Sequence, residues 1–563
     1  MTTALPVPPE VADAAITRAG IAMDRLLNTW VRERVTGFAP VEGEACILQV
    51  GAQRLRVSCL RASPGGFHRW RLPVRIEAAD GTERAVNDAA VVAGLMADVL
   101  ADEGGVPATT IKMRLKIAID GGENHALACV ARPADNSVMG MERSLWHGHP
   151  FHPFAKSIDG FSAHDVEHYA PERAAVFQLR WIIADRDVGA ALWRDAQAEA
   201  RSRKILAGLA GLSDKAIGER LLLPSHPWQA ERLECNPAFA NLAAQGRAIL
   251  TLPSGAWMQP TSSVRTLFAP EANIFLKLPI EARITNFVRT NPREQIARSM
   301  AAGRALAAIQ EQVVACGLDI LDEPGAIWID HPDLEAITGV ILRDAPARKA
   351  YVLAGLLEPS AHDGRPMLAT MGCNPSSASE AEAWLRAYVR KAVLPPLRLF
   401  ALTGVSLEAH SQNSLLALDR GNPDRLIVRD LEGVSIDRER FKSVAPGLDL
   451  DASVFFPAEE ARQRLVYYLI SNQLNHVVAT IARLADVPEI SLWHAVTDTL
   501  ANVTEDGETE GLIAWLLELE TLPAKANFTS CFAGRGERPD YVAIANPLWL
   551  ALRGERRGRA VRT

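Results

Sequence analysis

The stretch QPTSSVRTLFAPEANIFLKLPIEARITNFVRTN, residues 259–291, decides the fold of this chain. It opens with a polar turn and continues through two runs, NIFLKLPI and ARITNFVRT, whose apolar and β-branched residues predict neighbouring strands. At Asn291 the pattern changes, because an Asn cap and Pro292 begin a helical run that ends at Gly317. Strands followed directly by a helix predict a mixed α+β fold with its sheets near the middle of the chain.

Segments on both sides extend this mixed pattern. Towards the N-terminus we expect helices at 11–35, 87–103 and 195–212, and strands at 45–50, 54–60, 69–77 and near 220. Towards the C-terminus we expect a helix at 379–402 that Pro395 and Pro396 interrupt, strands at 414–418 and 425–430 that form a hairpin, and helices at 458–485, 489–502 and 510–520.

The composition narrows the classes of function. The length of 563 residues is too great for one core, so we expect two to four packed units. A net charge of −7 gives no general attraction for nucleic acid, and an anionic ligand needs a local basic pocket. Seven cysteines without a CxxC pair argue against disulfides and Cys-based zinc sites. With no signal peptide or apolar span in view, we expect a cytoplasmic protein with no membrane partner. The basic end of the chain, 553–563, is expected to fray.

The segment SSVRT carries a first group of polar side chains. Ser262, Ser263, Arg265 and Thr266 stand in the turn, and Lys277 follows on the next strand. Hydroxyls, a guanidinium and an ammonium together suit a polyphosphate, because Arg supplies a planar fork and Lys a compact charge. The alternative is a polar turn beside a surface lysine. No GxxxxGK[ST] motif occurs, so this is not a P-loop.

A second group lies in ITNFVRTN. On a strand, Thr285 and Arg289 point to the same face, so a hydroxyl and a guanidinium converge on what could be a carboxylate. The alternative is a strand-end arginine on a solvated face.

A third group is EAHSQN, residues 408–413, with Asp430 across the predicted hairpin. If the loop is extended, Glu408, His410 and Gln412 share one face. Glu408, Asn413 and Asp430 offer the hard oxygen ligands that Mg²⁺ prefers, in an order that protein kinases also use. The alternative is a loop whose polar side chains only cap their neighbours.

A fourth group is a cluster of histidines in residues 141–170. Its members are His147, His149, His152, His164 and His168. HxHxxH spacing could supply zinc ligands, but two prolines and Lys156 fit a basic loop over phosphates better. A purely structural role is the third possibility.

Taken together, six motifs in this order resemble a known family. GHPFHPFAKSIDGF, SHPWQ, PTSSVRTLF, KLPIEARITNFVRTN, EAHSQN and RDLEG are similar to the NRPS-independent siderophore (NIS) synthetases, the IucA/IucC family. The resemblance covers roughly residues 145–550, and the first 140 residues carry no usable motif.

The resemblance implies a reaction and an architecture. Such enzymes use ATP and Mg²⁺ to adenylate a carboxylate of citrate, a related polycarboxylate or a citrate monoamide, and an amine or alcohol then forms an amide or ester. The implied fold is a multi-domain cradle, likened to thumb (1–145), fingers (146–375) and palm (376–563), in a homodimer.

The resemblance also implies roles for single residues. ATP contacts fall on His149, Lys156, Ser263, Arg265, Thr266 and Lys277, and contacts to the carboxylate substrate fall on Thr285, Arg289 and His410. Mg²⁺ contacts fall on Glu408, Asn413 and Asp430, with Gln412 nearby. Catalysis falls on Lys277, Arg265, His410 and Arg289. One departure bears on substrate choice: many members have a basic residue soon after the loop lysine, whereas Ser157 and Ile158 follow Lys156 here.

Rival functions lack parts that they need. A kinase-like phosphotransferase acting on a small molecule shares the Lys, Asn and Asp, but HRDxxxxN and DFG are absent. The C-terminal part of such chains is also likened to ferric-siderophore reductases, but an iron–sulfur centre needs clustered cysteines, and only Cys531 follows Cys373. A non-catalytic iron-handling protein would not need both a cation set and a Mg²⁺ set.

Overall fold

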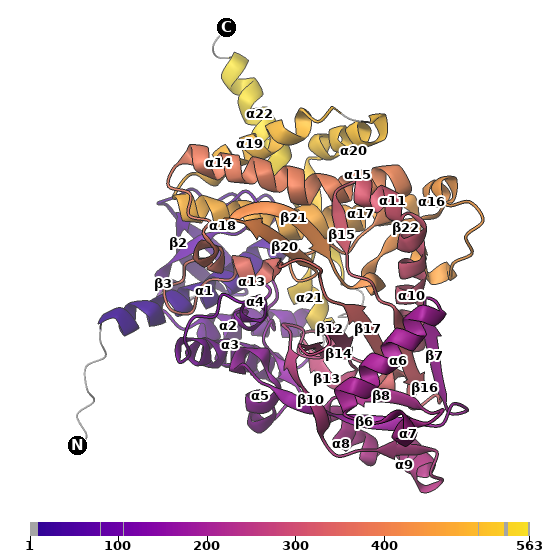
Figure 1. The fold of residues 1–563 in the computed structure, drawn as a ribbon. Coiled ribbons are helices and arrows are strands. Elements are labelled where there is room, and N and C mark those ends of the chain that lie inside the picture. The colour runs from indigo at the N-terminus through magenta and orange to yellow at the C-terminus, as the bar shows by residue number, and fades with distance from the viewer. Residues whose placement is uncertain (1–8, 79, 105, 505, 534–538, 561–563) are drawn as a thin grey trace, which may run out of the picture.

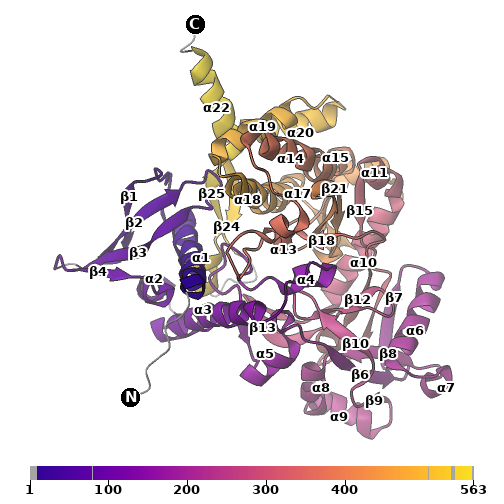
Figure 2. The same ribbon diagram turned by 60° about the vertical axis from the view of Figure 1, so that its left-hand side comes forward.

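The computed structural model describes residues 9–78, 80–104, 106–504, 506–533 and 539–560. Helices and sheets alternate along the chain, so the predicted α+β class is confirmed (Figure 1). Figure 2 shows the N-terminal elements on the left, a large sheet with its helices at the lower right and the C-terminal helices at the top.

The N-terminal elements form a four-stranded antiparallel sheet covered by helices. Its elements are α1 (Pro9–Arg34), β1 (Ala45–Val50), β2 (Gln53–Arg61), β3 (Arg69–Glu77), β4 (Glu83–Val86), α2 (Ala89–Gly104) and α3 (Ala108–Val130). The two helices and three strands expected here are confirmed, while β4 and α3 were not predicted.

The central part is a nine-stranded sheet with the order β7-β16-β17-β12-β11-β10-β6-β8, in which β9 also pairs with β6. Its strands are β6 (Phe177–Ala184), β7 (Gly189–Trp193), β8 (Leu221–Ser225), β9 (Ala248–Leu250), β10 (Ser254–Pro260), β11 (Thr266–Ala269), β12 (Ile274–Lys277), β16 (Gly325–Ile329) and β17 (Val340–Asp344). Helices α6 (Ala196–Ala210), α7 (Asp214–Ile217), α8 (Pro227–Glu234), α9 (Pro237–Ala244) and α12 (Glu335–Thr338) accompany it. The predicted helix at 195–212 is confirmed.

A smaller sheet of β5 (Ile158–Asp159), β13 (Ile280–Ile284) and β14 (Phe287–Arg289) lies beside the large one. The short helices α4 (Val138–Arg143) and α5 (Ala163–Tyr169) lead into it. The helix predicted to run from Asn291 to Gly317 is divided at Ile309 into α10 (Arg293–Ala308) and α11 (Gln310–Ala315). Asn291 does not cap α10; its side chain has a different use, described below.

The C-terminal part packs helices around two small sheets. The first contains β15 (Leu318–Ile320), β21 (Asn422–Val428), β20 (Ser414–Asp419) and β18 (Tyr351–Val352), and the second β19 (Val405–Ser406), β22 (Ser435–Asp437) and β23 (Phe455–Phe456). The helices are α13 (Leu353–Leu357), α14 (Ala378–Tyr388), α15 (Leu394–Thr403), α16 (Arg438–Val444), α17 (Ala458–Leu465), α18 (Asn475–Ala485), α19 (Glu489–Ala501), α20 (Gly507–Glu518), α21 (Asn527–Phe532) and α22 (Pro547–Ala560). The predicted hairpin and helices are confirmed; the β24 (Thr521–Lys525) and β25 (Tyr541–Ala545) pair was not predicted.

Two long helices of this part change pitch without ending. A π-helical segment, Val389–Val393, joins α14 to α15 just before Pro395 and Pro396, so the expected interruption is a local widening. A second one, Val466–Leu474, joins α17 to α18. The basic end predicted to fray is helical as far as Ala560, and residues 561–563 lie outside the described part.

Helix α21, from the C-terminal part of the chain, completes the N-terminal core. Phe528 and Phe532 of α21 pack among the buried residues of α1, β2, α2 and α3. Phe528 is fully buried and meets Trp30 at a ring-centroid distance of 6.1 Å. Glu33 of α1 accepts the backbone N–H groups of Phe528 and Thr529 at 2.8 Å, which satisfies the first turn of α21.

Within the described residues, no helix is long and apolar enough to cross a bilayer.

We expect Phe528→Ala to loosen the N-terminal core, since emptying a buried Phe site costs about 3–5 kcal/mol. Hydrogen–deuterium exchange in α1 and α2 should become faster. Leu252→Ala, at a side chain 79% exposed, is the control and should leave exchange unchanged. Unchanged protection of α1 in Phe528→Ala would contradict this packing.

Candidate active site

Lys277 ends β12 and lies buried inside the large sheet. Thr266 of β11 is its cross-strand partner on one side. Its Nζ lies 2.7 Å from Oδ1 of Asp430 and 3.1 Å from Oε2 of Glu432, both of which follow β21. Since Lys277 is only 2% exposed, the alternative of a surface lysine is wrong.

The charges in this group support one another. Burial acts to lower the pKa of Lys277, but Asp430 and Glu432 outweigh it and raise that pKa. Burial acts to raise the pKa of Asp430, but Lys277 and Arg343 hold it well below its usual range. Arg343 lies 3.3 Å from Oδ1 of Asp430 and also pairs with Glu323. Lys277, Asp430 and Arg343 therefore stay charged at neutral pH.

The SSVRT turn is held in an uncommon backbone conformation beside Lys277. Val264 has φ of +67°, which costs free energy for a β-branched residue, and Oγ of Ser263 accepts the N–H of Thr266 at 3.2 Å. Nη1 of Arg265 donates to the carbonyls of Arg289 and Thr290 at 3.0 Å. The turn therefore links the large sheet to the β13–β14 hairpin.

Asn291 connects the same parts, and its motif alone did not predict this. Its Oδ1 accepts from Arg265 at 2.6 Å, and its Nδ2 donates to the carbonyls of Lys277 at 3.1 Å and Gly339 at 2.8 Å. The side chain is 1% exposed, so these bonds are shielded from water. Asn291 positions both Arg265 and Lys277.

Thr285 and Arg289 converge, although not on one strand as predicted. Thr285 lies in the turn of the β13–β14 hairpin with φ of +58°, and Arg289 lies on β14. The chain folds back at Thr285 and Asn286, directly after Ile284. This turn brings Oγ1 of Thr285 to 3.1 Å from Nη2 of Arg289. Burial and the charge of Arg265 lower the pKa of Arg289 to about 10, so it remains a cation at pH 7. No carboxylate of the described residues lies within ion-pair distance of it.

The 408–413 loop brings polar side chains to the same region. Nδ1 of His410 accepts the N–H of Gln412 at 3.2 Å, which turns the loop back on itself, so it is not extended as assumed. Oε2 of Glu408 accepts from Nδ2 of Asn413 at 3.3 Å. Gly433 leaves room for Glu408, since a Cβ there would lie 2.0 Å from its Oε2. Burial lowers the pKa of His410, which is therefore neutral at pH 7.

A buried ion pair outside any predicted motif fixes this loop. Arg429 lies 2.6 Å from Oε1 of Glu142, and its Nη2 donates to the carbonyl of Gln412 at 2.9 Å. Oε2 of Glu142 accepts the N–H of Ser262 at 3.0 Å. Glu142 therefore joins the SSVRT turn to the 408–413 loop across more than a hundred residues of chain.

The histidine-rich loop has residues of two kinds: some face the site, and others hold the loop in place. His149 lies within 3.5 Å of Asn472, and burial, with the nearby His152 and His410, keeps its pKa well below the ordinary value. The ammonium of Lys156 instead bonds to Glu172 and, at 2.7 Å, to the carbonyl of Leu145. Lys156 is thus paired with a buried carboxylate that holds the loop in place, and its contact with phosphates stays a prediction that the variant below tests.

The zinc alternative finds no support. Among the residues that the structure describes, no three His, Cys, Asp or Glu side chains gather as metal ligands would. His164 and His168 stack on α5 at a centroid distance of 3.9 Å, and His152 accepts the N–H of Phe154 through Nδ1.

Comparison with known proteins identifies the family. The IucA / IucC family profile matches residues 137–358. L-2,3-diaminopropanoate–citrate ligase of Staphylococcus aureus is 36% identical over 430 residues, which cover 72% of this chain and 74% of that protein. The chain belongs to the IucA/IucC family of NIS synthetases.

Further similarities agree with this assignment. The siderophore biosynthesis protein RhbC of Rhizobium meliloti is 28% identical over 86% of this chain and 89% of its own length. The ATP-bound aerobactin synthetase IucA of Klebsiella pneumoniae has the same fold, with a TM-score of 0.83 and 25% identity over 94% of this chain and 99% of that one. A profile of FhuF-like ferric iron reductase transporters matches residues 382–540. These relatives are siderophore synthetases, so the comparisons do not favour a kinase-like function.

We expect Lys156→Met to destabilise the protein and leave ATP affinity unchanged. Removing one partner of a buried ion pair leaves the other charge uncompensated, which costs about 3–5 kcal/mol. Lys156→Met/Glu172→Gln, which removes both charges, should recover much of this loss. The measurements are the unfolding midpoint and ATP affinity by calorimetry. Weaker ATP binding with an unchanged midpoint would restore the phosphate contact.

Proposed function

We propose that this siderophore synthetase uses ATP to activate a carboxylate of citrate, or of a related polycarboxylate, and joins it to an amine. The observation that carries the proposal is Arg289. It is a cation without a carboxylate partner among the described residues, beside Thr285 and close to the Arg265 turn. A guanidinium held in this way suits a substrate carboxylate.

The proposed reaction has two steps. A carboxylate oxygen attacks the α-phosphorus of ATP, the bond to the β-phosphate breaks and pyrophosphate leaves. The amine nitrogen then attacks the acyl carbon, loses a proton, and AMP leaves with the carboxylate oxygen. Both substrates are anionic, so Arg265, Lys277 and Arg289 offset their repulsion and hold them in line.

The phosphates would lie against the SSVRT turn and Lys277. Asp430 and Glu432 neutralise Lys277, so we propose that binding of ATP exchanges these partners. His149 and His410, both neutral because they are buried, can accept or donate hydrogen bonds there without adding charge.

For Mg²⁺, Glu408, Asn413 and Asp430 supply hard oxygens, but Asp430 is shared with Lys277. This set fits Mg²⁺ held jointly by the protein and ATP phosphates, because Mg²⁺ binds through few carboxylates and keeps several waters. When bound, the ion offsets the charge of the triphosphate.

The amine is proposed from the similarity to a citrate ligase of known amine. Because L-2,3-diaminopropanoate–citrate ligase shares 36% of its residues over three quarters of its length, a diamino acid is the first nucleophile to test. We also propose that the enzyme acts in the cytoplasm. We further propose that it is a homodimer, and light scattering after gel filtration would measure the mass of the assembly.

We predict that Arg289→Ala abolishes citrate-dependent release of pyrophosphate while ATP affinity changes little. Loss of a buried guanidinium that pairs with a substrate carboxylate costs about 2–5 kcal/mol. Arg283→Ala, on the same hairpin but exposed, is the matched control and should remain active. If Arg289→Ala lost ATP binding and kept its response to citrate, the acid and nucleotide halves of the site would be exchanged. Release of ADP in place of AMP would refute the proposed reaction.

Removal of the Mg²⁺ ligands gives an independent test. Asp430→Asn and Asn413→Ala should each raise the Mg²⁺ concentration for half-maximal activity, since each removes or weakens an oxygen ligand. Asp424→Asn, on the strand leading to Asp430, should leave it unchanged. Equal Mg²⁺ dependence in all variants would count against this ligand set.

A further inference from the structure

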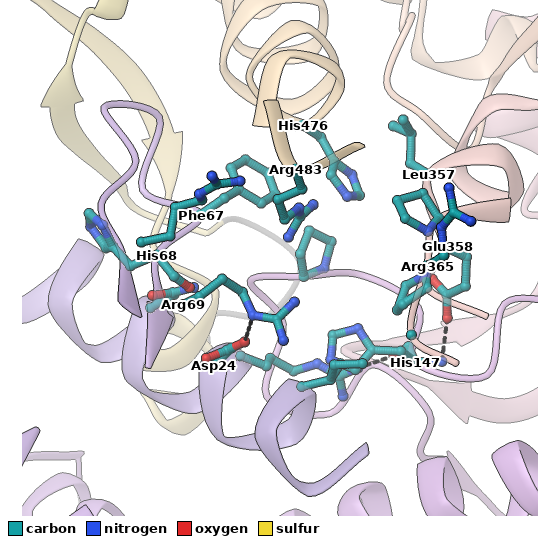
Figure 3. Close-up of a pocket in the computed structure, with 18 of the residues that line it drawn as sticks. Asp24, Phe67, His68, Arg69, His147, Leu357, Glu358, Arg365, His476 and Arg483 are labelled. Carbon is teal, nitrogen blue, oxygen red and sulfur yellow. Dashed lines mark hydrogen bonds and ion pairs between the residues drawn. The ribbon is translucent and has the colours of Figure 1, made fainter. Parts of the chain in front are cut away.

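The turn that carries His149 also borders a second hollow. Through His147, Gly148 and Pro150 it closes one side of a cavity of about 480 Å³ between α1, the β2–β3 segment, the loop after α13 and α18 (Figure 3). None of the residues assigned above to phosphate, acid or Mg²⁺ contact lines this cavity.

The hollow has more positive than negative charge. Arg69 pairs with Asp24 at 2.6 Å and Arg61 with Asp486 at 2.7 Å. Three further lining guanidiniums, those of Arg25, Arg365 and Arg483, have no carboxylate within 4 Å in the described part of the chain. The remaining lining carboxylate, Glu358, accepts the backbone N–H groups of His147 and Gly148.

Several buried polar atoms around the hollow lack partners. Nε of Arg25, Nε of Arg483 and Nε2 of His147 make no hydrogen bond to any described residue. Arg25 is 7% and His147 9% exposed, so water reaches them poorly. Buried polar groups are nearly always satisfied in proteins, and orphaned ones point to a missing ligand or water. Burial lowers the pKa of Arg25 and of Arg483 to about 10, which leaves both charged at neutral pH.

We propose that this hollow is a second anion site, which binds a small polycarboxylate of about the size of citrate. The unpaired Arg25, Arg365 and Arg483 come from three separate elements around it, so its charges suit several separated carboxylates better than one compact phosphate. Figure 3 shows Arg365 and Arg483 on different sides of the hollow. Planar guanidiniums bind carboxylates through paired hydrogen bonds. Phe67 and His476 stack with their centroids 4.8 Å apart and form one wall of the hollow. This wall suits the carbon chain that joins the carboxylates of the ligand.

The hollow is linked to the reaction site by one short turn. Arg25 donates to the carbonyl of His147, and Glu358 holds the N–H groups of His147 and Gly148, next to His149. Arg25 therefore connects a ligand in the hollow to the segment that positions His149. This inference rests on the charges of the hollow and not on the proposed reaction.

The test is citrate binding by calorimetry to the full chain without ATP, in an Arg289→Ala background that disables the reaction site. We expect one citrate per chain, and at least about 10-fold weaker binding when Arg365→Gln or Arg483→Gln is added, as loss of a paired charge implies. Adding Arg203→Gln, at a surface ion pair outside the hollow, should change nothing. Arg365 is exposed, so its variant should fold even if that of Arg483 does not.

Two results would overturn the proposal. One is that the Arg289→Ala variant binds no citrate, or that adding Arg365→Gln to it leaves the affinity for citrate unchanged. The other is that inorganic phosphate displaces the citrate at equal or lower concentration, which would identify a compact anion as the ligand. Neither result depends on whether Arg289→Ala releases pyrophosphate, so the proposed reaction is judged separately.

Discussion

The buried contact of Lys277 with Asp430 and Glu432 is the interaction on which the rest of the site depends. It joins the large central sheet to the segment after the β20–β21 hairpin, 153 residues further along the chain. Each partner is fixed from behind: Asn291 holds the carbonyl of Lys277, and Arg343 shares Asp430 with Glu323. Such buried charges are tolerated only when paired and hydrogen-bonded, so the surrounding network is a requirement of the ion pair.

The backbone is under strain at the same places. Val264, Thr285 and Asp430 all have positive φ, and each lies in one of the three motifs that meet at Lys277. Conformations of this kind cost free energy and persist only where the surroundings impose them. Here Arg265, Asn291 and the ion pairs impose them. The site thus holds cations and hydroxyls prearranged for anionic substrates, which lowers the reorganisation that the reaction requires.

The residue types of SSVRT, ITNFVRT and EAHSQN indicate, segment by segment, groups that suit phosphate, carboxylate and Mg²⁺. That these segments meet at one site is implied by the family resemblance, and neither the residue types nor the resemblance predicts the contacts between them. The β-branched residues of ITNFVRT favour one strand through Thr285, whereas the chain turns at Thr285 and Asn286. Neither Gly nor Pro marks this turn, and Asn286 alone is a weaker signal. Asn291, Arg343 and Glu142 were missed because single polar residues whose partners are distant in sequence give no local pattern. The partner of Lys156 is unpredictable for the same reason, since nothing in the sequence distinguishes Glu172 from an ordinary surface acid.

Oxygen-18 transfer tests the central claim, that a carboxylate meets the α-phosphate at Lys277, most directly. Citrate labelled in its carboxyl groups would be turned over with ATP, Mg²⁺ and an amine, and the nucleotide analysed by mass spectrometry. The account predicts one labelled oxygen in AMP, and a rate of labelling about 10²-fold lower in Lys277→Met, as loss of a transition-state contact implies. Label in inorganic phosphate, or undiminished labelling of AMP by Lys277→Met, would contradict it.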